Sequence, residues 1–407
     1  MKKDIKKTTK KKKKKYKKEY TIKDMIVTMI ISILIGIILT FGVITILCGG
    51  KNIIFLSQKL NKFLDTYETI TTNYYEDLDE DALIDGAISG MLANVNDNYT
   101  IYSNSEVTLE FDDLVNGTYE GIGCAIREED KEIKIVTVYE NSPAAKSGIK
   151  ENDTILTVDG EDAITMGATK IAEYIKTKKE KATTLEILRD NEQQTIVVTR
   201  GKVDNPSVTS EIYEKNDKKI GYLDISIFAS NTKEQFKNKL ISLEESGISG
   251  LVIDVRGNNG GYLTTVVDII NMILPKGDII YQTKKNNKIE KFKDQTKEKR
   301  EYPIAVLINS GSASASEILA AAIKESYNGF VVGTTSFGKG TVQQVKKMKD
   351  GSMIKYTTEN WLSPKGNWIN EIGVEPTDEV QLNDEYYENP IVENDNQLQK
   401  ALELVSK

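Results

Sequence analysis

The sequence contains no histidine in 407 residues and only two cysteines, Cys48 and Cys124. Without an imidazole, an activated serine must use another base, and lysine is the obvious candidate. Two cysteines give no disulfide framework. Two cysteines without histidine also argue against an ordinary zinc site. We therefore expect no metal and no cofactor.

Charge is distributed unevenly along the chain. Residues 1–24 hold 13 lysines against three acidic residues, which gives this segment a charge of +10. Because the net charge of the chain is −7, residues 25–407 together carry a charge of −17. The lysines at positions 10–15 could be interpreted as a nucleic-acid patch. Beside an apolar run, membrane orientation and contact with anionic lipid are better interpretations, and we expect no nucleic-acid partner.

That apolar run covers residues 25–47 and contains 23 uncharged residues. At about 1.5 Å per residue it is long enough to cross a hydrocarbon core of about 30 Å. The lysines before it favour a cytoplasmic N-terminus and an extracytoplasmic remainder, and so a single-pass protein of the cell membrane. A cleaved signal peptide is the alternative, although its apolar region is usually only about 7–15 residues long.

Two patterns follow the apolar run. Residues 51–117 are predicted to be mostly helical, because Phe63, Tyr67, Ile70 and Tyr74 recur at spacings of three and four. A packing bundle or a homo-oligomer interface would use such a face. Residues 118–203 instead contain short strands, interrupted by one predicted helix over about 166–178, and indicate a small, partly open β-barrel. The predicted strands cover 121–126, 133–138, 154–158, 185–188 and 195–199.

Residues 204–383 alternate between apolar strands and helices. The predicted strands cover 250–255, 304–308 and 330–333, and the predicted helices cover 262–274 and 315–326. This alternation favours a largely parallel α/β sheet covered on both faces. A hairpin is predicted around Asp350-Gly351, between 341–348 and 352–358. Residues 384–407 are predicted to be a tail with a short helix over 396–404.

Four serines precede the predicted helix that begins near residue 315, in Asn309-Ser-Gly-Ser-Ala-Ser-Ala-Ser-Glu317. A helix N-terminus presents unpaired N–H groups that favour developing negative charge, so a serine there is well placed to attack a carbonyl. Serines also cap helices and pack closely. The pattern alone leaves both interpretations open, and it does not choose among the serines.

Lys339 lies in the glycine turn Phe337-Gly-Lys-Gly340. A lysine can act as a base only where burial keeps it neutral, since its ordinary pKa is about 10.4. If the segment is a strand, Gln343 shares a face with Lys339 and could hold the amine. Residues 333–339 also match the first seven positions of a phosphate-binding loop, but Gly340 stands where Ser or Thr would hold magnesium, which argues against a nucleotide site.

Two glycine loops could supply backbone N–H groups. Asp254-Val-Arg-Gly-Asn-Asn-Gly-Gly261 follows a buried strand and could complete an oxyanion hole, or could simply be a tight turn. Tyr119-Glu-Gly-Ile-Gly123 could present N–H groups of Gly121, Ile122 and Gly123 to a peptide carboxylate, or could be a structural hairpin.

Together these segments resemble the carboxyl-terminal processing peptidases, or tail-specific proteases, over roughly residues 58–407. Gly311-Ser-Ala-Ser-Ala-Ser-Glu317 with Phe337–Gly340 is similar to the catalytic signature of that family. Tyr119–Gly123 with Asn141-Ser-Pro-Ala-Ala145 is similar to its PDZ domain. Gly257 and Asn259 are small departures from the usual oxyanion loop. The resemblance implies a Clp-protease/crotonase-like core behind the PDZ domain.

By that resemblance Ser314 is the nucleophile, because the family serine lies 25 residues before the lysine. Lys339 is then the implied base, and Gln343 its orienting partner. The implied oxyanion donors are the N–H groups of Ala315 and Gly260, with Gly261 as the alternative. We expect a membrane-anchored serine endopeptidase that cleaves C-terminal regions of extracytoplasmic proteins. The rival is a non-proteolytic PDZ scaffold on a relic peptidase core.

Overall fold

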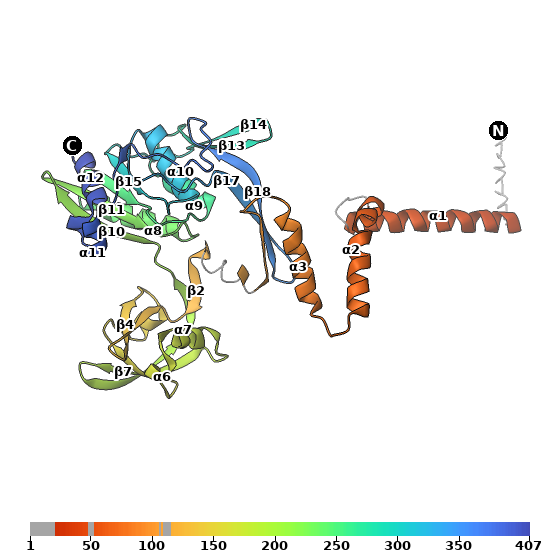
Figure 1. The fold of residues 1–407 in the computed structure, drawn as a ribbon, viewed down its shortest axis with the longest axis horizontal. Coiled ribbons are helices and arrows are strands. Elements are labelled where there is room, and N and C mark those ends of the chain that lie inside the picture. The colour runs from red at the N-terminus through yellow and green to blue at the C-terminus, as the bar shows by residue number, and fades with distance from the viewer. Residues whose placement is uncertain (1–20, 48–52, 106, 109–114) are drawn as a thin grey trace, which may run out of the picture. The chain divides into compact units, whose positions relative to one another are not determined.

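The structure, a computed structural model, describes residues 21–47, 53–105, 107–108 and 115–407 (Figure 1). The lysine-rich residues 1–20 and Cys48 lie outside these ranges. The chain divides into two compact units, Met1–Gly86 and Ala87–Lys407, which we describe separately.

The first unit contains the predicted apolar segment as the helix α1 (Ile22–Leu47). Its stretch Ile22–Val43 is long and apolar enough to cross a membrane. Asp24 accepts hydrogen bonds from the backbone N–H and the hydroxyl of Thr21, which fixes the first turn. The structure confirms the predicted N-terminal apolar helix. Its length and composition fit both a membrane anchor and a signal sequence.

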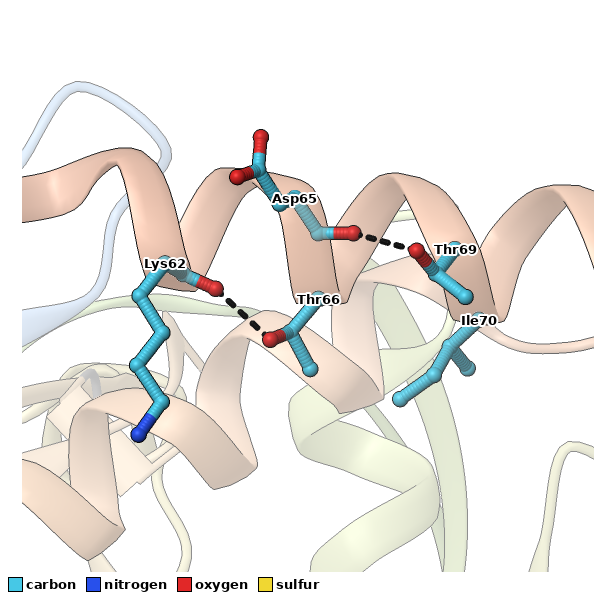
Figure 2. Close-up of a pocket in the computed structure, with 5 residues that line it drawn as sticks. All are labelled: Lys62, Asp65, Thr66, Thr69 and Ile70. Carbon is cyan, nitrogen blue, oxygen red and sulfur yellow. Dashed lines mark hydrogen bonds between the residues drawn. The ribbon is translucent and has the colours of Figure 1, made fainter.

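The predicted amphipathic helix is present as α2 (Ile53–Asn73), and α3 (Glu80–Ala93) follows it across the division between the units. Phe63 and Ile70 remain 42% and 40% exposed, so no described residue of this unit covers these two side chains. Figure 2 shows a hollow on α2 in which the hydroxyls of Thr66 and Thr69 donate to backbone carbonyls one turn earlier. The residues that line this hollow all come from one face of α2.

The β-rich segment forms a sheet in the order β3-β4-β5-β7-β8, with β6 beside β5, and a separate ribbon of β2 and β9. Its core includes the fully buried Ile133, Ile135 and Leu185. The predicted helix is present as α7, preceded by the short α6. The elements are β2 (Thr118–Gly121), β3 (Cys124–Glu129), β4 (Glu132–Val138), α5 (Pro143–Lys146), β5 (Thr154–Val158), β6 (Glu161–Asp162), α6 (Ala163–Met166), α7 (Ala168–Thr177), β7 (Ala182–Arg189), β8 (Glu192–Thr199) and β9 (Gly201–Asp204).

The α/β segment forms a six-stranded sheet in the order β10-β11-β12-β15-β16-β19. All neighbouring pairs from β11 to β19 are parallel, and β10 is antiparallel to β11, so the predicted largely parallel sheet is confirmed. Every residue of β12 and β15 is buried, as their continuous apolar sequences indicate. The strands are β10 (Val208–Lys215), β11 (Lys218–Ile225), β12 (Gly250–Asp254), β15 (Ile304–Ile308), β16 (Phe330–Gly333) and β19 (Asp378–Glu379).

Helices cover both faces of this sheet. On one face α8 (Thr232–Glu245), α9 (Leu263–Ile270) and α10 (Ala315–Ala322) share one apolar core, and α10 continues as the π-helical turn η1 (Ile323–Tyr327). On the other face α12 (Asn396–Val405) packs against sheet residues such as Val252 and Leu307. The short α11 (Asp384–Glu388) and η2 (Val392–Asn394) precede α12. The segment predicted as a tail therefore supplies part of the core.

A second sheet has the order β1-β18-β13-β14, with β17 also paired to β18. The predicted hairpin is present as β17 (Thr341–Lys347) and β18 (Met353–Leu362). The sequence did not predict β13 (Ile279–Lys285) or β14 (Lys288–Lys293). β14 has no buried face to give it an apolar alternation, whereas β13 has a buried stretch that was not recognised. The three-residue β1 (Ile101–Ser103) places a segment from before the β-rich domain beside β18.

Candidate active site

The four candidate serines differ sharply in their surroundings. The hydroxyls of Ser312 and Ser316 are fully buried and donate to the backbone carbonyls of Val255 (2.7 Å) and Asn258 (2.8 Å). Ser310 is exposed. Ser314 is half-buried at the N-cap of α10, with φ 55° and ψ −110°. Such strain in a residue other than glycine persists only where its surroundings impose it, and it occurs often at functional sites.

The carboxylate of Glu317 joins the serine loop to the lysine loop. It is fully buried and accepts four hydrogen bonds, from the backbone N–H groups of Ser314 (2.7 Å), Gly338 (2.7 Å) and Lys339 (2.9 Å) and from the hydroxyl of Ser336 (2.6 Å). Charge-assisted bonds of this kind compensate a buried carboxylate. Sequence reasoning missed this role, although a glutamate three residues after a helix-capping serine is the capping-box signal.

Lys339 lies in the turn before β17, with its carbonyl accepting a hydrogen bond from the Trp361 indole at 2.7 Å. Burial, and then repulsion from Lys355, lower the pKa of the Lys339 amine, while Glu317 and Asp97 act in the opposite direction. The shift has the sign that a lysine base requires. The following segment is a strand, whereas a phosphate-binding loop leads into a helix, so the geometry also excludes that alternative.

Gln343 lies on β17, and its amide nitrogen donates to the hydroxyls of Thr341 (2.8 Å) and Thr357 (3.2 Å). These two bonds leave its carbonyl oxygen as the end that could accept from Lys339. The predicted strand periodicity does not apply as stated, because Lys339 precedes the strand and a register shift separates Val342 from Gln343. Among the described residues no hydrogen bond joins the side chains of Ser314, Lys339 and Gln343.

The glycine loop after β12 lies directly against the candidate nucleophile. A Cβ built on Gly260 would lie 3.0 Å from the Ser314 Cβ and 3.1 Å from the Ala315 nitrogen. The Gly260 N–H, however, donates to the Asn258 side chain at 2.8 Å. Within the described ranges the N–H groups of Gly261 and Ala315 have no protein acceptor. In this conformation Gly260 is the glycine that contacts the serine loop, whereas Gly261, the alternative donor, is the one with a free N–H.

The predicted carboxylate-binding turn lies at the start of β3, an edge strand of its sheet. The carbonyls of Ile122 and Gly123 accept from Ala144 (2.7 Å) and Tyr139 (3.0 Å), whereas their N–H groups donate to no protein acceptor in the described part of the chain. Gly121 is the last residue of β2. Free N–H groups beside an open strand edge are the arrangement that captures a peptide C-terminus.

Comparison with known proteins defines the class to which this fold and site belong. Residues 219–380 match Peptidase family S41, residues 121–199 match the PDZ domain, and residues 49–107 match the activating protease CtpB N-terminal domain. The chain belongs to the S41 carboxyl-terminal processing peptidases with a PDZ domain, and it is a serine protease of that family.

Within that family the chain is similar to two proteases of Bacillus subtilis. It is 38% identical to the carboxy-terminal processing protease CtpB, covering 82% of this chain and 70% of that protein. It is 36% identical to CtpA, covering 83% of this chain and 72% of that protein. A solved structure from Bacteroides fragilis assigned to the S41 proteases matches with a TM-score of 0.52 at 15% identity, over 82% of this chain and 91% of that one, and supports the fold alone.

Proposed function

We propose that Ser314 is the nucleophile and Lys339 the general base of this peptidase. The observation that carries the proposal is the convergence of the two loops on Glu317. One carboxylate oxygen accepts from the backbone N–H groups of both Ser314 and Lys339, which holds the two residues beside each other. The strained backbone of Ser314 and the lowered pKa of Lys339 support the same roles.

In this mechanism neutral Lys339 accepts the hydroxyl proton of Ser314 as the serine oxygen attacks the scissile carbonyl. The N–H groups of Ala315 and Gly261 stabilise the resulting oxyanion, and Gly260 joins them only if Asn258 releases its N–H. Protonated Lys339 then gives its proton to the leaving amine, and water hydrolyses the acyl-enzyme. Gln343 orients the lysine through its amide oxygen.

Cleavage of a protein with an unstructured C-terminal tail tests these roles. Ser314→Ala and Lys339→Ala should each reduce cleavage by at least about a thousandfold. Ser310→Ala and Lys346→Ala are matched controls, because they remove the same groups from exposed neighbouring positions, and both should keep wild-type activity. A folded Ser314→Ala or Lys339→Ala variant with wild-type activity rules the assignment out. Wild-type activity in both variants would favour a different nucleophile.

The substrate in this proposal is the C-terminal region of an extracytoplasmic protein, and the turn Gly121–Gly123 binds its terminal carboxylate. The free N–H groups of Ile122 and Gly123 and the open edge of β3 support this. A peptide with a free C-terminus should bind at least about tenfold more tightly than the same peptide as an amide. Equal affinities would exclude carboxylate capture.

The proposed location is the cell membrane, with α1 as a single anchor, the lysine-rich end in the cytoplasm and the peptidase outside. The uncharged residues 25–47 of α1 and the thirteen lysines before residue 25 support this orientation. The full chain should sediment with membranes after alkaline extraction, and its N-terminal sequence should precede residue 22. A mature protein that begins after residue 47 would identify a cleaved signal sequence instead.

The exposed apolar stripe of α2, including Phe63 and Ile70, supports self-association through this helix. Light scattering should give a mass above that of one chain, and Phe63→Glu should reduce it to that of one chain.

We also keep the Clp-protease/crotonase-like architecture as a proposal for the core, supported by the parallel sheet with helices on both faces.

A further inference from the structure

An aromatic ring from a distant part of the sequence lies over the amine of Lys339. The Lys339 Nζ is 4.8 Å from the centroid of the Tyr99 ring. A lysine ammonium within about 6 Å of an aromatic centroid is attracted to the ring face. Nζ donates no hydrogen bond in the described part of the chain, so the ring is a main neighbour of the candidate base.

The ring is held in place by its own turn. The Tyr99 N–H and the Thr100 hydroxyl donate to the two carboxylate oxygens of Asp97, at 3.0 Å and 2.6 Å. The chain then enters β1, whose Ile101 pairs with Lys355 of β18. The Tyr99 backbone is therefore fixed at both ends, by a local turn and by a strand.

The same part of β18 also holds Gln343. The backbone N–H of Thr357 donates to the Thr100 hydroxyl at 3.2 Å, and the Thr357 hydroxyl accepts from the Gln343 amide at 3.2 Å. One residue of β18 thus contacts both the turn that carries Tyr99 and the candidate partner of the lysine. This arrangement ties the position of the ring to the position of the base.

Several charged groups face Lys339 from the elements around it. Lys355 of β18 disfavours its ammonium form, whereas Glu317 of α10 and Asp97 favour it, and Glu371 also lies near the Tyr99 ring. A third carboxylate at the ring position would keep the lysine protonated. An aromatic face attracts the ammonium more weakly and excludes water, so it suits a group that must be neutral before proton transfer and charged after it.

We propose that Tyr99 is a positioning residue of the peptidase, whose ring excludes water from the Lys339 amine and stabilises the ammonium that forms during catalysis. The proton moves from the Ser314 oxygen to Nζ as the serine oxygen bonds to the carbonyl carbon and the carbonyl electron pair moves to its oxygen. The inference rests on the proposed function of Ser314 and Lys339. It makes a segment before the PDZ domain part of the active site.

Three substitutions of Tyr99 distinguish the effect of its aromatic face from the effects of its hydroxyl and of its side-chain volume. Tyr99→Phe keeps the ring and should retain activity within about twofold. Tyr99→Leu keeps apolar bulk without the ring face, so kcat should fall about tenfold with KM unchanged, and the acid limb of the pH profile should move to lower pH. Tyr99→Ala admits water, so the acid limb should move to higher pH. Tyr75→Leu, at an 80% exposed tyrosine, is the control.

The readouts are kcat and KM across pH on the full chain, with the melting temperature as a check on folding. If Tyr99→Ala does not fold, the comparison of Tyr99→Phe with Tyr99→Leu tests the role of the ring. Equal kcat values and pH profiles for Tyr99→Phe and Tyr99→Leu would overturn the inference. If those two are equal while Lys339→Ala is inactive, only the role of Tyr99 fails. If Lys339→Ala is active, the proposed function itself fails.

Discussion

The two halves of the candidate site are built differently. On the serine side, Ser312, Ser316 and Glu317 are fully buried, and each makes hydrogen bonds that fix the loop. On the lysine side, Lys339 is only half-buried at the edge of a second sheet, and a turn from a distant segment borders it. The difference indicates that buried hydrogen bonds fix the serine loop and its link to the lysine loop, whereas in our proposal the amine of the base also relies on the segment before the PDZ domain.

Removing the Glu317 carboxylate should have the largest effect, because it joins the two halves. In Glu317→Gln one carboxylate oxygen becomes an NH₂ group. Each oxygen of Glu317 accepts two hydrogen bonds, so two buried donors of the neighbouring loops lose their acceptor. We expect a loss of about 3 kcal/mol in the free energy of unfolding and of more than about a hundredfold in cleavage. Urea denaturation and the tailed-substrate assay measure both.

The exposed Glu375 provides the matched control for Glu317, and Glu375→Gln should change neither quantity. A folded Glu317→Gln variant with wild-type stability and activity would mean that the two loops hold their positions without the carboxylate.

Gln343 probes the lysine side alone. Gln343→Ala removes the amide oxygen proposed to orient Lys339, so kcat should fall about tenfold with KM and stability nearly unchanged. Gln343→Glu places a carboxylate near the amine, raises its pKa and should move the acid limb of the pH profile to higher pH. The exposed neighbour Gln344 supplies the control Gln344→Ala. Wild-type kcat for Gln343→Ala would remove this residue from the site.

Substitutions of Ser312 and Ser314 should affect stability and cleavage activity differently. Ser312→Ala removes a buried hydroxyl that accepts from the Asn309 N–H and donates to Val255, and should cost about 1 kcal/mol of stability. Ser314→Gly should instead relieve the positive φ, stabilise the fold by about 1 kcal/mol and abolish cleavage. Urea midpoints test both variants, and a destabilised Ser314→Gly would mean that its backbone is not strained.

The smallest predicted effect concerns Asp224, which pairs with Asp254 across β11 and β12. Burial, and then repulsion from Asp254, raise the pKa of Asp224 to about 6, with Arg256 acting in the opposite direction. Because the folded-state pKa exceeds the unfolded value, the stability contribution of the protonated group is complete below about pH 4 and is lost as pH rises through about 6.

Asp224→Asn should therefore be about 1 kcal/mol more stable than the wild type at pH 7.5 and equal to it at pH 4, allowing for solvent screening. Urea midpoints at the two values measure the difference. Asp217→Asn, at an exposed aspartate, should shift neither midpoint. A wild-type midpoint that does not fall with pH relative to Asp224→Asn would place the Asp224 pKa near its ordinary value.

The sequence predicted many of the elements whose patterns are local, although α8 and the hairpin of β10 and β11 were not among them. The apolar runs gave the buried strands β12 and β15, and a family resemblance selected Ser314 among four serines that the pattern could not separate. The structure adds a physical difference, since the hydroxyls of Ser312 and Ser316 donate to core carbonyls. The three-residue β1 and the solvent-exposed β14 lack a local pattern and were not predicted.

Tertiary contacts explain the remaining omissions. Nothing near Tyr99 in the sequence indicates Lys339, because their contact exists only after β1 pairs with β18. Whether Gly260 or Gly261 offers a free N–H depends on the side chain of Asn258, which no backbone pattern fixes. The four bonds to Glu317 come from two loops, and only the bond to Ser314 follows a local capping rule.

The pH dependence of fluorophosphonate labelling tests most directly whether Ser314 is activated by a neutral lysine, and it also separates a peptidase from an inactive scaffold. Labelling of the wild type should rise with pH through one ionisation below the ordinary lysine pKa of about 10.4, because burial disfavours the Lys339 ammonium. It should be absent in Ser314→Ala and slow, without that ionisation, in Lys339→Ala. Labelling of Ser314→Ala, or an unchanged rate and pH profile in Lys339→Ala, would show that the serine–lysine assignment is wrong.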